Sequence, residues 1–135
     1  MKTVFADTWF FRAILSERDQ HHDKVVQYLG ETEDFIITTR WVLAETANAA
    51  AGSAYREDAA RFLVQVESDP DMTIIKESDV LYQRGMKLYI SRSDKAWSLT
   101  DCISFVVMDE LGITEALTAD HHFEQAGFRP LFAGN

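Results

Sequence analysis

Short runs of apolar residues alternate along this chain with longer segments in which apolar residues recur three or four positions apart. The short runs are rich in β-branched and aromatic residues and predict strands at 3–6, 35–39, 72–76 and 115–119, with 129–133 as a candidate last strand. The longer segments have helical periodicity and predict helices at 9–15, 19–30, 40–51, 58–68, 79–91, 98–112 and 121–127.

The predicted strands are apolar along their whole length and do not alternate with polar residues. This pattern is typical of parallel strands that are covered on both faces, and strands that alternate with helices favour the same arrangement. We therefore expect an α/β fold, three-layer α/β/α with a central, mainly parallel sheet, in a single domain over 1–135. Gly30 is expected to end the second helix, and Gly85 to weaken the helix over 79–91.

Charge and cysteine content limit the kinds of partner and the cellular compartment that we expect for this protein. With 13 Lys and Arg against 22 Asp and Glu, the formal net charge is −9, so a broad basic face for nucleic acid is excluded. Asp7 and Arg12 interrupt the apolar N-terminal run, unlike in a signal peptide, and no segment has the apolar length of a membrane span. The single cysteine, Cys102, precludes an intramolecular disulfide. We expect a cytoplasmic protein that makes no use of a membrane.

Four acidic residues stand where strands end or helices begin. Asp7 follows the strand at 3–6 and Asp120 follows 115–119, whereas Glu45 lies in the helix after 35–39 and Asp101 in the first turn of the helix at 98–112. In open parallel sheets, right-handed crossovers bring the carboxyl ends of the strands to one edge, and ligands bind there. The four carboxylates are therefore candidates for one site.

Carboxylates held this close together need a cation or a proton. Two of them ~4 Å apart repel by roughly 4 kcal/mol at an effective dielectric constant near 20. Oxygen ligands without histidine or cysteine suit Mg²⁺ and Mn²⁺, which can orient a phosphodiester, activate water and stabilise the leaving oxygen.

Each acid also has a purely structural interpretation. Ser98-Leu99-Thr100-Asp101 fits a capping box, so Asp101 can simply cap its helix. Asp120 can cap the helix over 121–127, Asp7 can be a turn residue, and Glu45 can be a solvated helix residue. A structural origin for all four would require their shared placement to be a coincidence.

The chain resembles the PIN-domain ribonucleases, and most closely the VapC-type toxins. The resemblance covers essentially the whole chain and is most specific in its last two motifs. The matching segments are VFADTWF around Asp7, TTRWVLAET around Glu45, SLTDCISFVVMDELGI around Asp101 and ALTADHHFEQAGF around Asp120.

The resemblance implies a metal-dependent endoribonuclease that hydrolyses RNA with Mg²⁺ or Mn²⁺ and leaves a 5′-phosphate and a 3′-hydroxyl. It also implies a homodimer that is the toxin of a toxin–antitoxin pair, silenced by an antitoxin protein. By position, the implied catalytic and metal-binding residues are Asp7, Glu45, Asp101 and Asp120, supported by Thr8 and Thr118.

Trp9 departs from the family, which often has a small or polar residue two places after the first Asp. It can stack on a base, contribute to the core or contact a second subunit. The nearest basic residues in sequence are Arg12, Arg40, Arg92 and Lys95, and surface charge is the ordinary role of each.

The doublets His21-His22 and His121-His122 are not expected to chelate a metal, because neighbouring residues on a helix point about 100° apart. A contact between RNA and His121 or His122 is open, since both follow Asp120. Cys102 is expected to be a small buried residue.

Two other functions remain as alternatives. One is a PIN-like module that binds RNA or protein without cleaving it, which loss of an acid would favour. The other is a phosphatase of the haloacid dehalogenase type, which would use Asp7 after its strand but needs a second Asp at position 9, where this chain has Trp9.

Overall fold

The computed structural model describes residues 1–134, so Asn135, the last residue of the expected 1–135 domain, lies outside it. Five parallel strands form one sheet in the order β3-β2-β1-β4-β5. Their bounds are β1 Thr3–Ala6, β2 Phe35–Thr39, β3 Met72–Ile75, β4 Glu115–Leu117 and β5 Arg129–Pro130.

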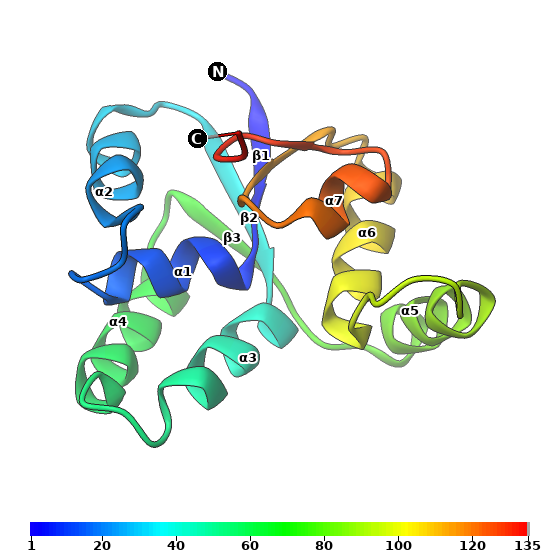
Figure 1. The fold of residues 1–135 in the computed structure, drawn as a ribbon, viewed down its shortest axis with the longest axis horizontal. Helices are drawn as coiled ribbons and strands as arrows, with labels where there is room; N and C mark the ends of the chain where they lie inside the picture. The colour runs from blue at the N-terminus through cyan, green and yellow to red at the C-terminus, as the bar shows by residue number, and fades with distance from the viewer. Residues whose placement is uncertain (135) are drawn as a thin grey trace.

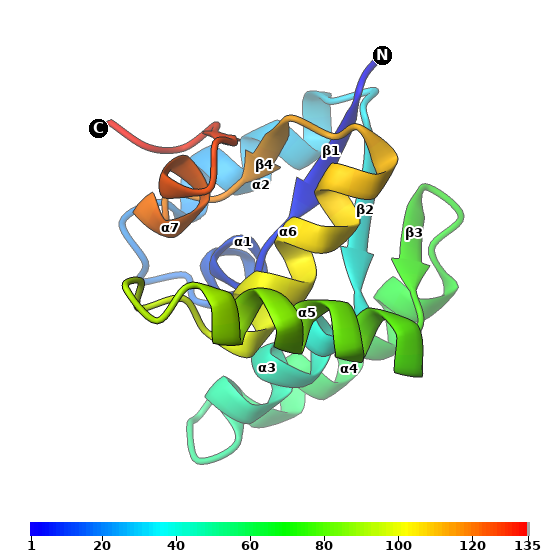
Figure 2. The same ribbon diagram turned by 90° about the vertical axis from the view of Figure 1, so that its right-hand side faces the viewer.

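Seven helices within the described residues flank this sheet. Figure 1 shows α1, α2 and α4 on one side of the sheet, α5 to α7 on the other and α3 below the ends of the strands, and Figure 2 shows α5 lying across α6. Their bounds are α1 Thr8–Leu15, α2 His22–Glu31, α3 Arg40–Ala50, α4 Arg56–Ser68, α5 Asp79–Ser91, α6 Leu99–Leu111 and α7 His121–Gln125. The α/β/α class and the parallel sheet predicted from the sequence are confirmed.

The central strand explains why the strands lack polar alternation. In β1, Val4, Phe5 and Ala6 are fully buried, because helices pack on both faces. Phe5 is paired with Ile37 on β2 and with Ala116 on β4. Because β1 is held between two layers of helices, the position of Asp7, which directly follows it at the edge of the sheet, is fixed as well.

Four of the seven described helices begin at the carboxyl edge of the sheet because each of the strands β1 to β4 is followed within a few residues by a helix. Thr39 ends β2 and caps α3, where its hydroxyl accepts a hydrogen bond from the backbone N–H of Val42 at 3.2 Å. Asp7 stands between β1 and α1. The N-terminal turns of α1 and α3 therefore lie at the same edge.

Two local predictions were wrong, and one glycine has a packing role that its helix propensity did not indicate. α2 continues through Gly30 to Glu31. β4 ends at Leu117, so Asp120 stands three residues beyond the strand and does not follow it directly; its capping of α7 agrees with its structural interpretation. Gly85 is buried against α6 and lets the two helices approach: a Cβ built there would overlap Ile103 Cγ1 and lie 3.3 Å from Ile103 Cα.

Among the described residues, no helix combines the length and the apolar character needed to cross a lipid bilayer.

Candidate active site

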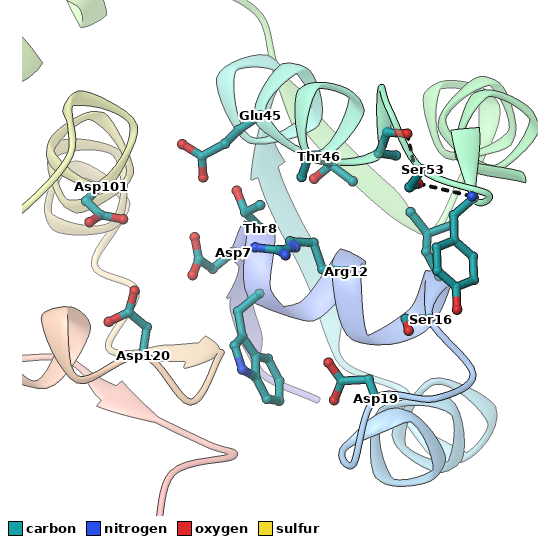
Figure 3. Close-up of a pocket in the computed structure, with 15 residues that line it drawn as sticks. Asp7, Thr8, Arg12, Ser16, Asp19, Glu45, Thr46, Ser53, Asp101 and Asp120 are labelled. Atoms are coloured by element: carbon teal, nitrogen blue, oxygen red, sulfur yellow. Dashed lines mark hydrogen bonds between the residues drawn. The ribbon is translucent and has the colours of Figure 1, made fainter. Parts of the chain in front are cut away.

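The four acids meet at one cavity, although they come from separate parts of the sequence. The cavity has a volume of about 590 Å³ and lies at the carboxyl edge of the sheet. Figure 3 shows the four carboxylates directed toward a common space, from the end of β1, from α3, from α6 and from the loop before α7. These residues are Asp7, Glu45, Asp101 and Asp120.

Asp7 is the most deeply buried of the four, with 4% of its surface exposed. Its Oδ2 accepts a hydrogen bond of 3.1 Å from the hydroxyl of Thr118 at the end of β4. Burial, together with the neighbouring carboxylate of Asp101, raises the pKa of Asp7 to about 7. A carboxyl group held in this way either keeps a proton at neutral pH or requires a cation.

Asp101 both caps its helix and faces the cavity, the two roles that its position in the sequence left open. It closes a capping box at the start of α6: its N–H donates to Ser98 Oγ at 3.0 Å, and its Oδ2 accepts from the Ser98 N–H at 3.1 Å. The same Oδ2 lies 3.1 Å from Nδ1 of His122 and faces the cavity. Burial raises the pKa of Asp101, although the hydrogen bonds from Ser98 and His122 act in the opposite direction.

Asp120 is half-buried and is the N-cap of α7, where its Oδ1 accepts from the His122 N–H at 2.9 Å. Its own N–H donates to Thr118 Oγ1 at 3.0 Å. Thr118 therefore joins the Asp7 carboxylate to the backbone of Asp120, and it is fully buried in doing so. This places Thr118 beside the acids, as the sequence indicated.

Glu45 comes from the second turn of α3 and is half-buried. Within residues 1–134 its carboxylate has neither a hydrogen bond nor an ion pair. It therefore differs from the other three acids, whose carboxylates are held by Thr118, by Ser98 and His122, or by the first turn of α7. Among the described carboxylates that line the cavity, Glu45 is the one without such a partner.

Thr8, the first residue of α1, also lines the cavity. Its Oγ1 is the single buried side-chain oxygen or nitrogen in the described part of the chain that lacks a hydrogen-bond partner. A buried hydroxyl without a partner is costly in a folded protein, and such groups are found where a ligand or water completes the bonding.

Sequence reasoning missed the part played by His122. Its Nδ1 lies 3.1 Å from Asp101 Oδ2 and 3.5 Å from Asp120 Oδ1, so it contacts two of the four acids. Ligand atoms of Asp120, His121 and His122 all lie within 4.8 Å of one another, so the geometric reason for discounting this doublet does not hold, while its binding of a metal stays an open prediction. The available signal was the position of His122 in the first turn of a helix capped by Asp120, where the side chain folds back toward the cap.

Of the four basic residues near the acids in sequence, Arg12 alone belongs to the described lining of the cavity. Arg40 is paired with Glu67 at 2.9 Å and Glu77 at 3.4 Å, and Arg92 is paired with Asp94 at 2.9 Å. Trp9 lines the cavity while its ring packs against His21 and Phe132.

Cys102 is buried, as expected, next to Asp101 in α6. Burial and the neighbouring Asp101 carboxylate raise the pKa of its thiol to about 11, which leaves it protonated and unreactive at neutral pH.

The chain is an α/β domain with a parallel five-stranded sheet and acids gathered at the carboxyl edge of that sheet. The PIN domain family matches residues 4–129, and the chain belongs to this family. The family assignment made from the sequence is confirmed.

Within this family, the chain is similar to a toxin of Mycobacterium tuberculosis. The chain is 25% identical over 131 residues to the 23S rRNA-specific endonuclease VapC20 of strains CDC 1551 and H37Rv, and the match covers 93% of this chain and 95% of VapC20. The crystal structure of VapC20, described as a Sarcin-Ricin loop cleaving toxin, superposes with a TM-score of 0.84 at 22% identity over the same shares of the two chains. The structural match supports the fold.

Proposed function

We propose that this protein is a metal-dependent endoribonuclease and the toxin of a type II toxin–antitoxin pair. One observation carries the proposal: in a PIN domain, four carboxylates from distant parts of the chain line one cavity, and the most buried of them has its pKa raised to about 7. The two endonuclease relatives, which align over nearly the whole chain, support the same activity.

The residues present fit a hard divalent cation such as Mg²⁺ or Mn²⁺. Asp7, Asp101 and Asp120 offer carboxylate oxygens, and the Thr8 hydroxyl, buried without a partner, offers another oxygen to the same space. The raised pKa of Asp7 marks a buried acid that a cation would ionise. When bound, such a cation would stabilise the charge that develops on the phosphodiester and would lower the pKa of water.

The protein's own groups would prepare the site for hydrolysis. Thr118 holds the Asp7 carboxylate, and His122 and Ser98 hold that of Asp101, so these oxygens are oriented before substrate arrives. Glu45, which has no partner among residues 1–134, is the acid that can accept the proton of the attacking water. In-line attack at phosphorus would leave a 5′-phosphate and a 3′-hydroxyl.

The proposed partners and location follow from this activity. The substrate is RNA, and a cognate antitoxin would silence the enzyme, for which the net charge of −9 favours a basic inhibitory segment. A cytoplasmic location and a homodimer belong to the same proposal, as does a single nuclease domain over 1–135.

Cleavage of single-stranded and structured RNA by the purified chain tests the proposal. With Mg²⁺ or Mn²⁺ we expect internal cuts bearing 5′-phosphates, abolished by EDTA and reduced at least a hundredfold in Asp101→Asn. Binding of RNA without cleavage under all metal conditions would support the alternative of a PIN-like binding module. Undiminished cleavage by Asp101→Asn would remove Asp101 from the site.

A further inference from the structure

The geometry points to Arg12 as the residue that binds a backbone phosphate of the RNA, in an arm of the cavity that runs between α1 and α3 away from the four acids. The arm is defined here by Arg12, Ser16, Ala49, Ser53 and Tyr55, all of which line the cavity. This inference deepens the proposed function and rests on it. The four acids would hydrolyse the RNA, and the arm would bind the part of the RNA strand next to the cleaved bond.

One wall of the arm is a stripe along α1. Thr8 and Arg12 are spaced four residues apart, which places them on one face of the helix, Ser16 follows as its C-cap, and all three line the cavity. Arg12 lies one helical turn, or ~6 Å, beyond the start of α1 beside Asp7. Figure 3 shows the Arg12 side chain extending from α1 toward the Asp7 end. An RNA strand whose reacting phosphate lies among the acids therefore has another phosphate within reach of Arg12.

The opposite wall leaves room for a ligand. Ala49 and Ala50 near the end of α3 have short side chains, and Ser53 and Tyr55 follow in the turn before α4. Apolar and aromatic surface beside a charged group suits an unpaired nucleotide, whose base can stack while its phosphate is neutralised.

Charge singles out Arg12. Of the described residues that line the cavity, five are acidic and Arg12 is the sole Lys or Arg. Within residues 1–134 its guanidinium forms no ion pair, whereas Arg40, Arg61, Arg84 and Arg92 each pair with a carboxylate. An arginine that lies in an acidic cavity and yet stays more than 4 Å from every carboxylate oxygen retains its five donors for another anion.

A structural role as counter-ion to the acids is the competing explanation. Within residues 1–134 Arg12 forms no ion pair with them, and it is not among the groups that shift the pKa of Asp7. A protein of net charge −9 also has few sites that attract RNA. The loss of one correctly placed cation should therefore weaken its affinity for RNA strongly.

The test compares Arg12→Gln with Arg18→Gln. Arg18 is a matched control: it is exposed, follows α1 in the next turn, has no ion pair within the described chain and does not line the cavity. Both variants lose one positive charge. Binding of a fluorescent single-stranded RNA is measured by anisotropy in EDTA, and single-turnover cleavage is measured with Mn²⁺ at several KCl concentrations.

We expect Arg12→Gln to raise the Kd and the half-saturating concentration roughly tenfold, with a smaller change in maximal rate. The slope of log Kd against log salt should fall by about 0.7, the value for one phosphate contact on a single strand. Arg12→Lys should recover the slope and part of the affinity, and Arg18→Gln should resemble the wild type.

Equal effects of Arg12→Gln and Arg18→Gln, or weaker binding with an unchanged salt slope, would overturn the assignment of Arg12. Failure of the proposed function has a different signature. If the wild-type protein binds RNA with the Arg12-dependent salt slope but never cleaves it, the assignment of Arg12 stands and the proposed nuclease activity is overturned. If the wild-type protein neither binds nor cleaves RNA, both proposals are overturned.

Discussion

The hydroxyl of Thr118 donates a hydrogen bond of 3.1 Å to Oδ2 of Asp7, across 111 residues of sequence. The two residues follow neighbouring parallel strands, β4 and β1, whose pairing brings Ala6 beside Leu117. The bond is therefore a direct consequence of sheet order, and it fixes the orientation of a buried carboxylate before any ligand is bound. Because Thr118 Oγ1 also accepts from the Asp120 N–H, one hydroxyl sets the relative positions of two acids.

Burial of Asp7 predicts a specific dependence of stability on pH in the metal-free protein. The pKa of Asp7 is about 7 in the folded chain, against an ordinary value of 3.8, so between these values the folded form holds a proton that the unfolded form has released. The unfolding free energy contributed by this group therefore falls as pH rises from about 4 to about 7, by about 1.4 kcal/mol per pH unit, and stays low above 7. Asp7→Asn should remove this dependence and be more stable than the wild type at pH 8 in EDTA.

Thermal unfolding in EDTA and in Mn²⁺ at pH 5 and pH 8 measures the effect. Mn²⁺ should raise the Tm of the wild type more at pH 8 than at pH 5 and leave Asp7→Asn unchanged. Asp109→Asn, at an exposed position in α6, is the control for loss of an acid. An Asp7→Asn protein less stable than the wild type at pH 8 would contradict the account.

His122 and His121 are neighbours with different predicted effects. His122 contacts Asp101 at 3.1 Å and has 19% of its side chain exposed, whereas the His121 side chain is 72% exposed. If His122 orients the carboxylate, His122→Ala should raise the Mn²⁺ concentration needed for half-maximal cleavage by about 10- to 100-fold. His121→Ala should change it little.

The metal titration of cleavage also tests whether the two histidines bind the ion themselves. Equal losses in the two variants would indicate that Asp120, His121 and His122 act as a set of ligands, as their mutual spacing within 4.8 Å permits. That result would contradict a purely orienting role for His122.

Gly85 and Gly30 are a matched pair of helical glycines with opposite predictions. A methyl group at Gly85 overlaps Ile103 of α6, so Gly85→Ala should lower the unfolding free energy by about 1–3 kcal/mol. A Cβ at Gly30 would have no atom within 4 Å, so Gly30→Ala should raise the unfolding free energy by up to ~1 kcal/mol through helix propensity. Urea unfolding measures both. Stabilisation by Gly85→Ala would show that α5 and α6 are packed less closely than described.

The strands and helices could be predicted from the sequence because their apolar patterns reflect burial between layers, as in Val4-Phe5-Ala6. The acids could be located because strand ends share an edge in a parallel sheet. The role of Gly85 could not, because it depends on the approach of Ile103 from another helix. The sequence named Arg12 and His122 among several candidates but could not single them out, since only the folded chain shows which histidine meets Asp101 and which arginine lines the cavity.

Binding of Mn²⁺ to acid-to-amide variants, measured by calorimetry and set beside RNA cleavage, tests the central claim most directly. Asp19 lines the same cavity at its far end and supplies the control, Asp19→Asn. We expect Asp7→Asn, Asp101→Asn and Asp120→Asn to lose Mn²⁺ affinity and cleavage together, Glu45→Gln to lose cleavage above all, and Asp19→Asn to retain both. Unchanged Mn²⁺ affinity in the first three variants, or equal loss in Asp19→Asn, would contradict a metal site built by these acids.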